Sequence, residues 1–66
     1  QKAKELIKLL PQRQREIVIL RVFHEMSFNE ISEILKISPE SARTNFYFGI
    51  NKLRKTLKRE AIIYEM

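Results

Sequence analysis

The chain has 66 residues, enough for one small domain with a single hydrophobic core. It contains no cysteine, no aspartate and one histidine, His24, which excludes disulfides and thiolate metal sites and leaves little for acid–base catalysis. We therefore expect a protein that is not an enzyme, needs no cofactor and binds no small molecule. No apolar run approaches the roughly 20 residues of a membrane span, so we expect no membrane partner and a cytoplasmic location.

Positive charge is concentrated toward the end of the chain. Thirteen basic and eight acidic residues give a net charge of +5, a balance that favours a polyanionic partner. The stretch from 43 to 59 contains no acid, and its basic residues are Arg43, Lys52, Arg54, Lys55, Lys58 and Arg59. The last third of the chain is thus the expected binding region.

The first half of the sequence predicts two helices. Apolar residues spaced i, i+3, i+4, i+7 form one stripe that ends before Pro11: Ala3, Leu6, Ile7 and Leu10. A second helix is predicted to begin at or just after Pro11, whose missing N–H suits a first turn. The apolar residues at 17–20, with Val22 and Phe23, could also describe a strand, but no second strand is available to pair with it. We therefore predict a largely buried central helix.

Two further helices are predicted to follow in quick succession. Ser27 and Glu30 have the spacing of a capping box, and the buried stripe of this third helix is predicted to be Phe28, Ile31, Ile34 and Leu35. Ser38 caps the next helix and Pro39 takes its first position. Only Lys36 and Ile37 remain for the turn, which is typical of a helix-turn-helix. We predict an all-α, four-helix domain with a helix-turn-helix over 27–57.

The last helix has two distinct predicted faces. Its core face comprises Ala42, Phe46, Gly49, Leu53 and Leu57, with Ile50 at the edge. A glycine in mid-helix costs about 1 kcal/mol relative to alanine, and close approach of another helix is the expected compensation. The opposite face comprises Glu40, Arg43, Thr44, Tyr47, Phe48 and Asn51.

Residues near the start of the second helix of a helix-turn-helix reach base edges in the major groove, which makes Glu40, Arg43, Thr44 and Tyr47 candidates for base reading. Arg43 could donate two hydrogen bonds to guanine, and Glu40 could accept one from cytosine. The expected DNA-backbone contacts farther along are Asn51, Lys52, Arg54 and Lys55. Alternatives stay open. Glu40 could be an acid that the helix dipole favours in the first turn, with no base contact, and the basic run could be a solvated face. Phe48 could pack on a thymine methyl, on a protein partner or on the side of the preceding helix.

Several stretches together resemble region 4 of bacterial RNA polymerase sigma factors, specifically the extracytoplasmic-function type. They are Leu10-Pro11-x-Arg13-Gln14-Arg15-Glu16-Ile17, Leu20-Arg21-x-Phe23, Ser27-Phe28-x-Glu30-Ile31-Ser32-Glu33-Ile34-Leu35-x-Ile37-Ser38, Ala42-Arg43-Thr44 and Lys52-Leu53-Arg54. The resemblance implies a promoter-binding domain whose last helix enters the major groove of the minus-35 element. It also implies a contact with the flap of the polymerase β subunit and, in many such proteins, inhibition by an anti-sigma factor.

The resemblance also implies individual roles. Base contacts fall on Glu40, Arg43, Thr44 and Asn45, and backbone contacts fall near Ser38, Ser41 and Tyr47. Because the sequence begins with glutamine, we expect residues 1–66 to be one domain from the C-terminal part of a longer chain.

The sequence departs from the family pattern at several positions. Lys36 replaces the usual turn glycine and must either accept a positive φ at about 1 kcal/mol or reshape the turn. Ser32 stands where alanine is usual. Asn45, Phe48 and Ile50 occupy positions where the family often has arginine or another base, so weak intrinsic DNA affinity is expected. Linkage to other promoter contacts would compensate for it.

Two alternatives differ from the sigma-factor interpretation. A LuxR-type response-regulator output domain shares the E-I-x-x-x-L-x-I-S core, but it dimerises and reads palindromic targets. A helical protein-interaction module could have kept the fold and lost DNA reading, binding a partner through Tyr47, Phe48 and the apolar tail Ile62-Ile63-Tyr64. Salt dependence separates DNA binding from an apolar protein interface.

Overall fold

Residues 2–65 contain four helices: α1 (Lys2–Ile7), α2 (Gln12–Val22), α3 (Phe28–Leu35) and α4 (Pro39–Glu65). The structure is a computed structural model that describes the backbone of residues 2–65 and the side chains of residues 4–59. The predicted roles of Ala3 and of the tail Ile62-Ile63-Tyr64 concern side chains outside these described residues. The all-α prediction with a helix-turn-helix is confirmed.

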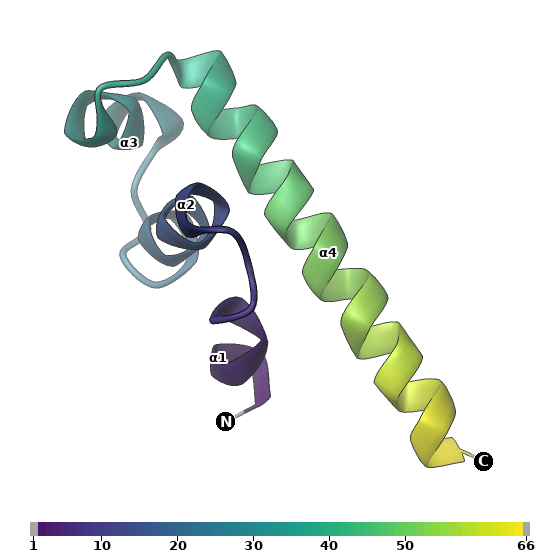
Figure 1. Ribbon diagram of the computed structural model, residues 1–66. Coiled ribbons are helices and arrows are strands. Elements are labelled where there is room, and N and C mark those ends of the chain that lie inside the picture. The colour runs from purple at the N-terminus through teal and green to yellow at the C-terminus, as the bar shows by residue number, and fades with distance from the viewer. Residues whose placement is uncertain (1, 66) are drawn as a thin grey trace.

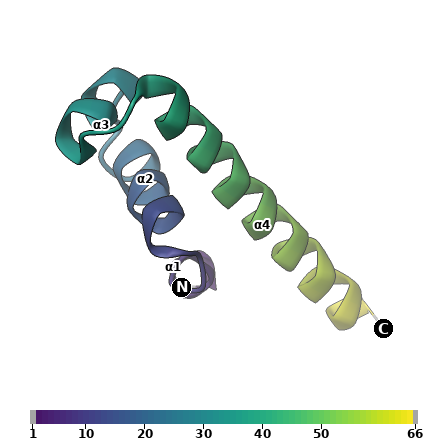
Figure 2. The same ribbon diagram turned by 45° about the horizontal axis from the view of Figure 1, so that its top comes forward.

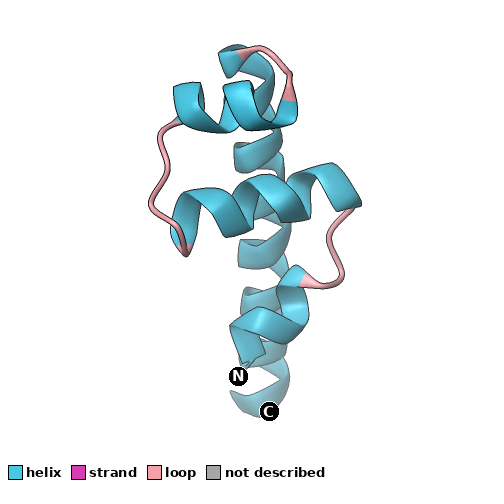
Figure 3. Cartoon of the chain, turned by 90° about the vertical axis from the view of Figure 1, so that its left-hand side faces the viewer, coloured by secondary structure: helices cyan, strands magenta, loops and turns pink. Residues whose placement is uncertain are grey.

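The three short helices lie along one side of α4, as Figures 1 and 3 show. Figure 2, seen from a tilted viewpoint, shows α4 running on past α1 toward the C-terminus. A helix of 27 residues is about 40 Å long, and the domain measures 45 Å along its longest axis. The length of the domain is therefore set by α4, and its thickness by the three helices packed on it. No helix in the described part of the chain is long and apolar enough to cross a membrane.

Two apolar clusters make up the core. One joins Ile7, Leu10 and Val18 between α1, α2 and α4, and the other joins Ile17, Ile31 and Ala42 between α2, α3 and α4. Phe46 packs against both clusters, which confirms it as a core residue and makes it the link between them.

Gly49 permits the close packing of α2 on α4. It is buried, and a Cβ atom placed there would lie 2.9 Å from Cγ2 of Val18. That distance is too short for a real contact, so the glycine is required by the approach of α2, as predicted.

The helix boundaries follow local signals. The Ser27 hydroxyl accepts from the Glu30 amide (3.1 Å), and the Ser27 amide donates to the Glu30 carboxylate (2.9 Å), so the predicted capping box is formed. The Ser38 hydroxyl accepts from the Ser41 amide at 3.0 Å and caps α4, whose first residue is Pro39. Pro11 precedes α2, as predicted.

Three predictions of burial were wrong. Ile34 is 58% exposed, because α3 packs through Ile31, Ser32 and Leu35 and leaves Ile34 beside an open groove. Leu57 is 45% exposed, because α4 turns Leu53, Thr56 and Arg59 toward the groove beside α1 and leaves Leu57 outside it. In α2 only Ile17 and Val18 are buried, and Val22 and Phe23 at its end are half exposed. In addition, α1 ends at Ile7, so Leu10 is buried from a turn and not from the helix.

Candidate nucleic-acid interface

A tight turn sets the angle between α3 and α4. Lys36 has φ 58° and ψ 47°, so it accepts the left-handed conformation that the family gives to glycine. The amide of Ile37 donates to the Ser32 carbonyl at 3.1 Å, and the Ile37 side chain packs on the cluster around Ile17 and Ala42. The turn is therefore anchored at both its backbone and its side chain, and it fixes the start of α4 against the rest of the domain.

The predicted reading face of α4 is open. Glu40, Arg43, Thr44, Tyr47 and Asn51 are all exposed. Phe48 lies on the same face and is 55% exposed. Six polar or aromatic side chains thus line one side of the first half of α4, a surface suited to a groove of DNA.

Asn45 differs from the other predicted base-reading residues. It is half buried, and its side-chain amide donates to the Ser41 carbonyl at 2.9 Å. Its Nδ2 is therefore engaged within the helix, whereas its Oδ1 keeps the capacity to accept a hydrogen bond from a base. Ser38 and Ser41 lie at the start of the helix, where the helix dipole favours a phosphate. These DNA contacts stay predictions.

The cationic side of the interface is also on α4. Between residues 39 and 59 the only acid is Glu40, while Lys52, Arg54 and Lys55 are exposed beyond the reading face. Ile50, at a position where the family often has a base, packs instead on the Leu10 and Val18 cluster. A charge there would face the core, so the expected deficit of phosphate contacts is smaller than the three positions suggested.

A stack of side chains that the sequence did not reveal holds Arg43 in place. The Arg43 guanidinium lies 5.5 Å from the centre of the Phe28 ring, and the Arg21 guanidinium lies 4.7 Å from the same centre. Arg21 also donates to the Met26 carbonyl at 3.0 Å, which fixes its position. Phe28 in turn meets Phe46 edge to face at 5.5 Å. The candidate guanine-reading arginine therefore rests on a ring anchored to the core.

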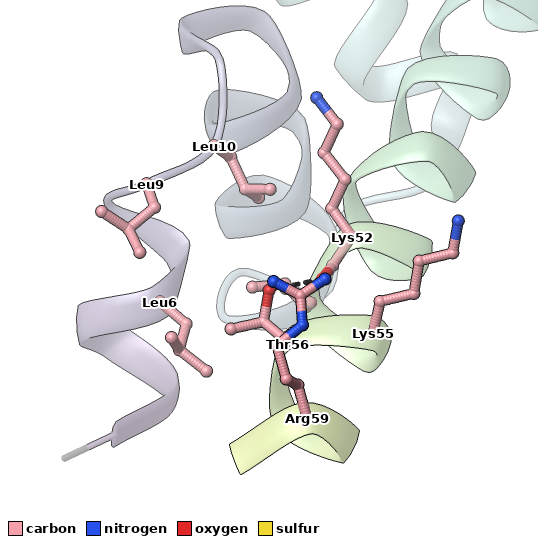
Figure 4. Close-up of a pocket in the computed structure, with 8 residues that line it drawn as sticks. Leu6, Leu9, Leu10, Lys52, Lys55, Thr56 and Arg59 are labelled. Carbon is pink, nitrogen blue, oxygen red and sulfur yellow. Dashed lines mark hydrogen bonds between the residues drawn. The ribbon is translucent and has the colours of Figure 1, made fainter.

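A separate groove lies between α1 and α4 (Figure 4). Its volume is about 230 Å³, and its lining comprises Leu6, Leu9, Leu10, Lys52, Leu53, Lys55, Thr56 and Arg59. Leu9 is 76% exposed, the most exposed of the large apolar side chains described. Two of the lysines predicted to contact phosphate, Lys52 and Lys55, thus also border an apolar groove, a shape suited to a protein.

The sequence matches the family described as Sigma-70, region 4, over residues 1–53. The chain belongs to this family. Comparisons with curated proteins and with solved structures gave no match. Sigma-70 region 4 is a helix-turn-helix, DNA-binding domain of sigma factors, which work with RNA polymerase and promoter DNA in transcription initiation, and it is not an enzyme family. This match supports the sigma-factor interpretation and not the LuxR-type alternative.

Proposed function

We propose that this region 4 domain reads the minus-35 promoter element within RNA polymerase holoenzyme, as the C-terminal domain of a longer sigma factor of the extracytoplasmic-function type. The observation that carries the proposal is the open face of α4, where Arg43, Thr44 and Tyr47 directly follow an anchored turn. Its site of action is the cytoplasm, where promoter DNA and polymerase meet.

The proposed division of labour follows from chemistry. Arg43 reads guanine, Glu40 accepts from cytosine, and Thr44, Asn45 and Tyr47 complete base reading. Ser38, Ser41, Asn51, Lys52 and Lys55 hold the DNA backbone, which adds affinity and salt dependence without sequence information.

A second proposed contact joins the domain to polymerase. The groove between α1 and α4 receives the flap of the β subunit, and its leucine floor with exposed Leu9 supports this assignment. An anti-sigma factor is a further proposed partner, on the strength of the family resemblance. Leu9→Ser, which removes the apolar side chain without adding a charge beside Lys52 and Lys55, should abolish binding of a purified flap fragment in titration calorimetry while leaving DNA binding unchanged. Equal flap binding by the variant would reject this groove as the flap site.

The DNA-reading role is tested by selecting from random duplex DNA at low salt with this chain. One short, non-palindromic motif should be enriched, and Arg43→Ala should remove the preference for one base pair at a cost of about 1–3 kcal/mol. The matched control is Arg59→Ala, which removes the same type of side chain from α4 outside the predicted reading positions. An enriched inverted repeat would favour a dimeric regulator. No enrichment at all would mean either a reader that needs polymerase or a domain whose Phe48 face binds a protein.

The phosphate contacts are tested by their salt dependence. Replacing both Lys52 and Lys55 with alanine should weaken binding to every sequence alike and make the logarithmic salt slope shallower by about 2. An unchanged slope would remove these lysines from the DNA interface.

A further inference from the structure

Two neighbouring grooves lie on the three short helices, away from both surfaces described above. The first, of about 330 Å³, is lined by Lys4, Ile7, Lys8, Arg15, Ile19 and Phe23. The second, of about 320 Å³, is lined by Glu16, Ile19, Leu20, Ile34 and Leu35. None of these residues comes from α4, which lies behind α1, α2 and α3 in Figure 3. The DNA-reading face and this surface are therefore on different elements.

The two grooves meet at Ile19, which lines both, and together they give this surface a largely apolar floor. At one end Phe23 is 49% exposed, and at the other Ile34 is 58% exposed. The core does not need these two side chains to be covered, since its central residues Ile17 and Ile31 are already fully buried. A partner that covers the floor would gain apolar burial without unfolding any part of the domain.

Charge identifies the kind of partner. Lys4, Lys8 and Arg15 surround the first groove, and no acid is among its lining residues. Arg15 is held toward α1, because its guanidinium donates to the Lys8 carbonyl at 3.4 Å. In the second groove Glu16 is the only charged lining residue, and it lies 3.7 Å from the guanidinium of Arg13, which offsets its charge. The surface therefore presents one apolar groove with a positive rim and, next to it, a second apolar groove whose one acid is paired.

We propose that this surface, defined by the linings of the two grooves and named the α1–α3 surface, binds an acidic amphipathic helix of a protein partner. Apolar side chains at i, i+3 and i+4 of the partner helix occupy the grooves, and its carboxylates face Lys4, Lys8 and Arg15. The grooves are concave and so accept inserted side chains, whereas a membrane-binding surface presents a protruding apolar face. The inference does not depend on DNA reading, since it uses no residue of α4.

The probe is a fluorescein-labelled synthetic helix of about 18 residues, with leucines on one face and glutamates elsewhere. The matched control probe has lysines in place of the glutamates. Fluorescence anisotropy with the whole chain should show saturable binding of the acidic helix and at least tenfold weaker binding of the basic one. Absence of saturable binding, or equal affinity for both probes, would overturn the proposal.

Two pairs of matched variants locate the site. Lys8→Glu should weaken binding of the acidic probe about tenfold, while Lys58→Glu, the same charge change at an exposed position of α4, should leave it within about twofold. Phe23→Ser should likewise weaken binding, while Phe48→Ser, at a phenylalanine of similar exposure, should not. The helical circular dichroism of each variant shows that it is folded, and Lys8→Glu tests the site without altering an apolar residue.

The outcomes separate the possible occupants. Binding lost on Lys58→Glu or Phe48→Ser instead would place the helix on α4 and overturn the proposal. Binding of anionic lipid vesicles that is lost on Lys8→Glu, without binding of the acidic helix, would assign the surface to a membrane and also overturn it. Enrichment of DNA motifs by the Lys8→Glu variant should equal that of the parent chain, so failure here and failure of DNA reading are distinguishable.

Discussion

Replacing Gly49 with alanine tests the packing of α2 against α4. Alanine is favoured over glycine by about 1 kcal/mol within a helix. Against this gain, the new Cβ would lie 2.9 Å from Cγ2 of Val18, a stiff β-branched side chain that is 1% exposed. Overpacking of this kind costs about 1–3 kcal/mol, so we expect a net loss of about 1 kcal/mol.

The same substitution should reverse its sign once Val18 is shortened. Val18→Ala removes Cγ2 and should itself cost about 2 kcal/mol, from lost burial and a small cavity. In that background the alanine at 49 meets its next neighbours, Leu10 Cδ1 and Gln14 Cβ, at ordinary distances of 3.5 and 3.6 Å. Gly49→Ala should then stabilise by about 1 kcal/mol, which gives a coupling energy of about 2 kcal/mol.

Urea denaturation followed by helical circular dichroism measures all four members of this cycle, and the loss in Gly49→Ala alone should lower the melting temperature by about 4–8 °C. Asn51→Ala is the control, because it raises helix propensity on the exposed face of α4 and should act alike in both backgrounds. If Gly49→Ala instead stabilised the parent chain by the full helix-propensity difference of about 1 kcal/mol, the close approach of α2 would be refuted.

Three further predictions concern the turn, the cap and the reading arginine. Lys36→Gly should stabilise the domain by about 1 kcal/mol in urea denaturation by relieving the positive φ, and an equal gain from Lys36→Ala would reject that cause. The Ser27 amide and hydroxyl lower the pKa of Glu30 in the folded state. The stabilisation of the fold by the ionised Glu30 side chain is therefore complete above the ordinary glutamate pKa and is lost as pH falls through the lowered pKa of the folded state. The parent chain should therefore lose more stability than Glu30→Gln between about pH 5 and 3, and parallel curves would contradict this. Phe28→Leu should reduce discrimination at the base pair read by Arg43 about tenfold in competition binding, and unchanged discrimination would show that the ring does not position Arg43.

The features that the sequence predicted correctly are mostly local. The capping box of Ser27 and Glu30 and the cap at Ser38 each depend on groups three residues apart, so spacing alone determines them. The turn between α3 and α4 was predictable because so few residues were available for it. Gly49 is the exception, a tertiary contact that was predicted because its local cost required a compensation.

The features that the sequence did not predict depend on how far the helices reach and on which side chains meet. Periodicity assigned Leu57 and Ile34 to apolar stripes, but it could not show that the groove beside α1 leaves Leu57 out or that α3 leaves a groove open beside Ile34. The stacking of Arg21 and Arg43 on Phe28 joins three helices, and no spacing within one helix indicates it. Only the LR-x-F stretch that contains Arg21 hinted that this arginine has a fixed role.

The positions of Lys52 and Lys55 connect the two proposed contacts of α4. Both side chains border the groove between α1 and α4, and both are proposed to hold DNA phosphates. A polymerase segment that fills the leucine floor without placing carboxylates near these lysines leaves their charge available to DNA. A regulator that brings carboxylates to the same rim neutralises them and weakens DNA binding, and by linkage DNA weakens that regulator equally. The charge of the bound segment, and not its apolar fit, therefore determines whether a protein in this groove assists or opposes promoter binding.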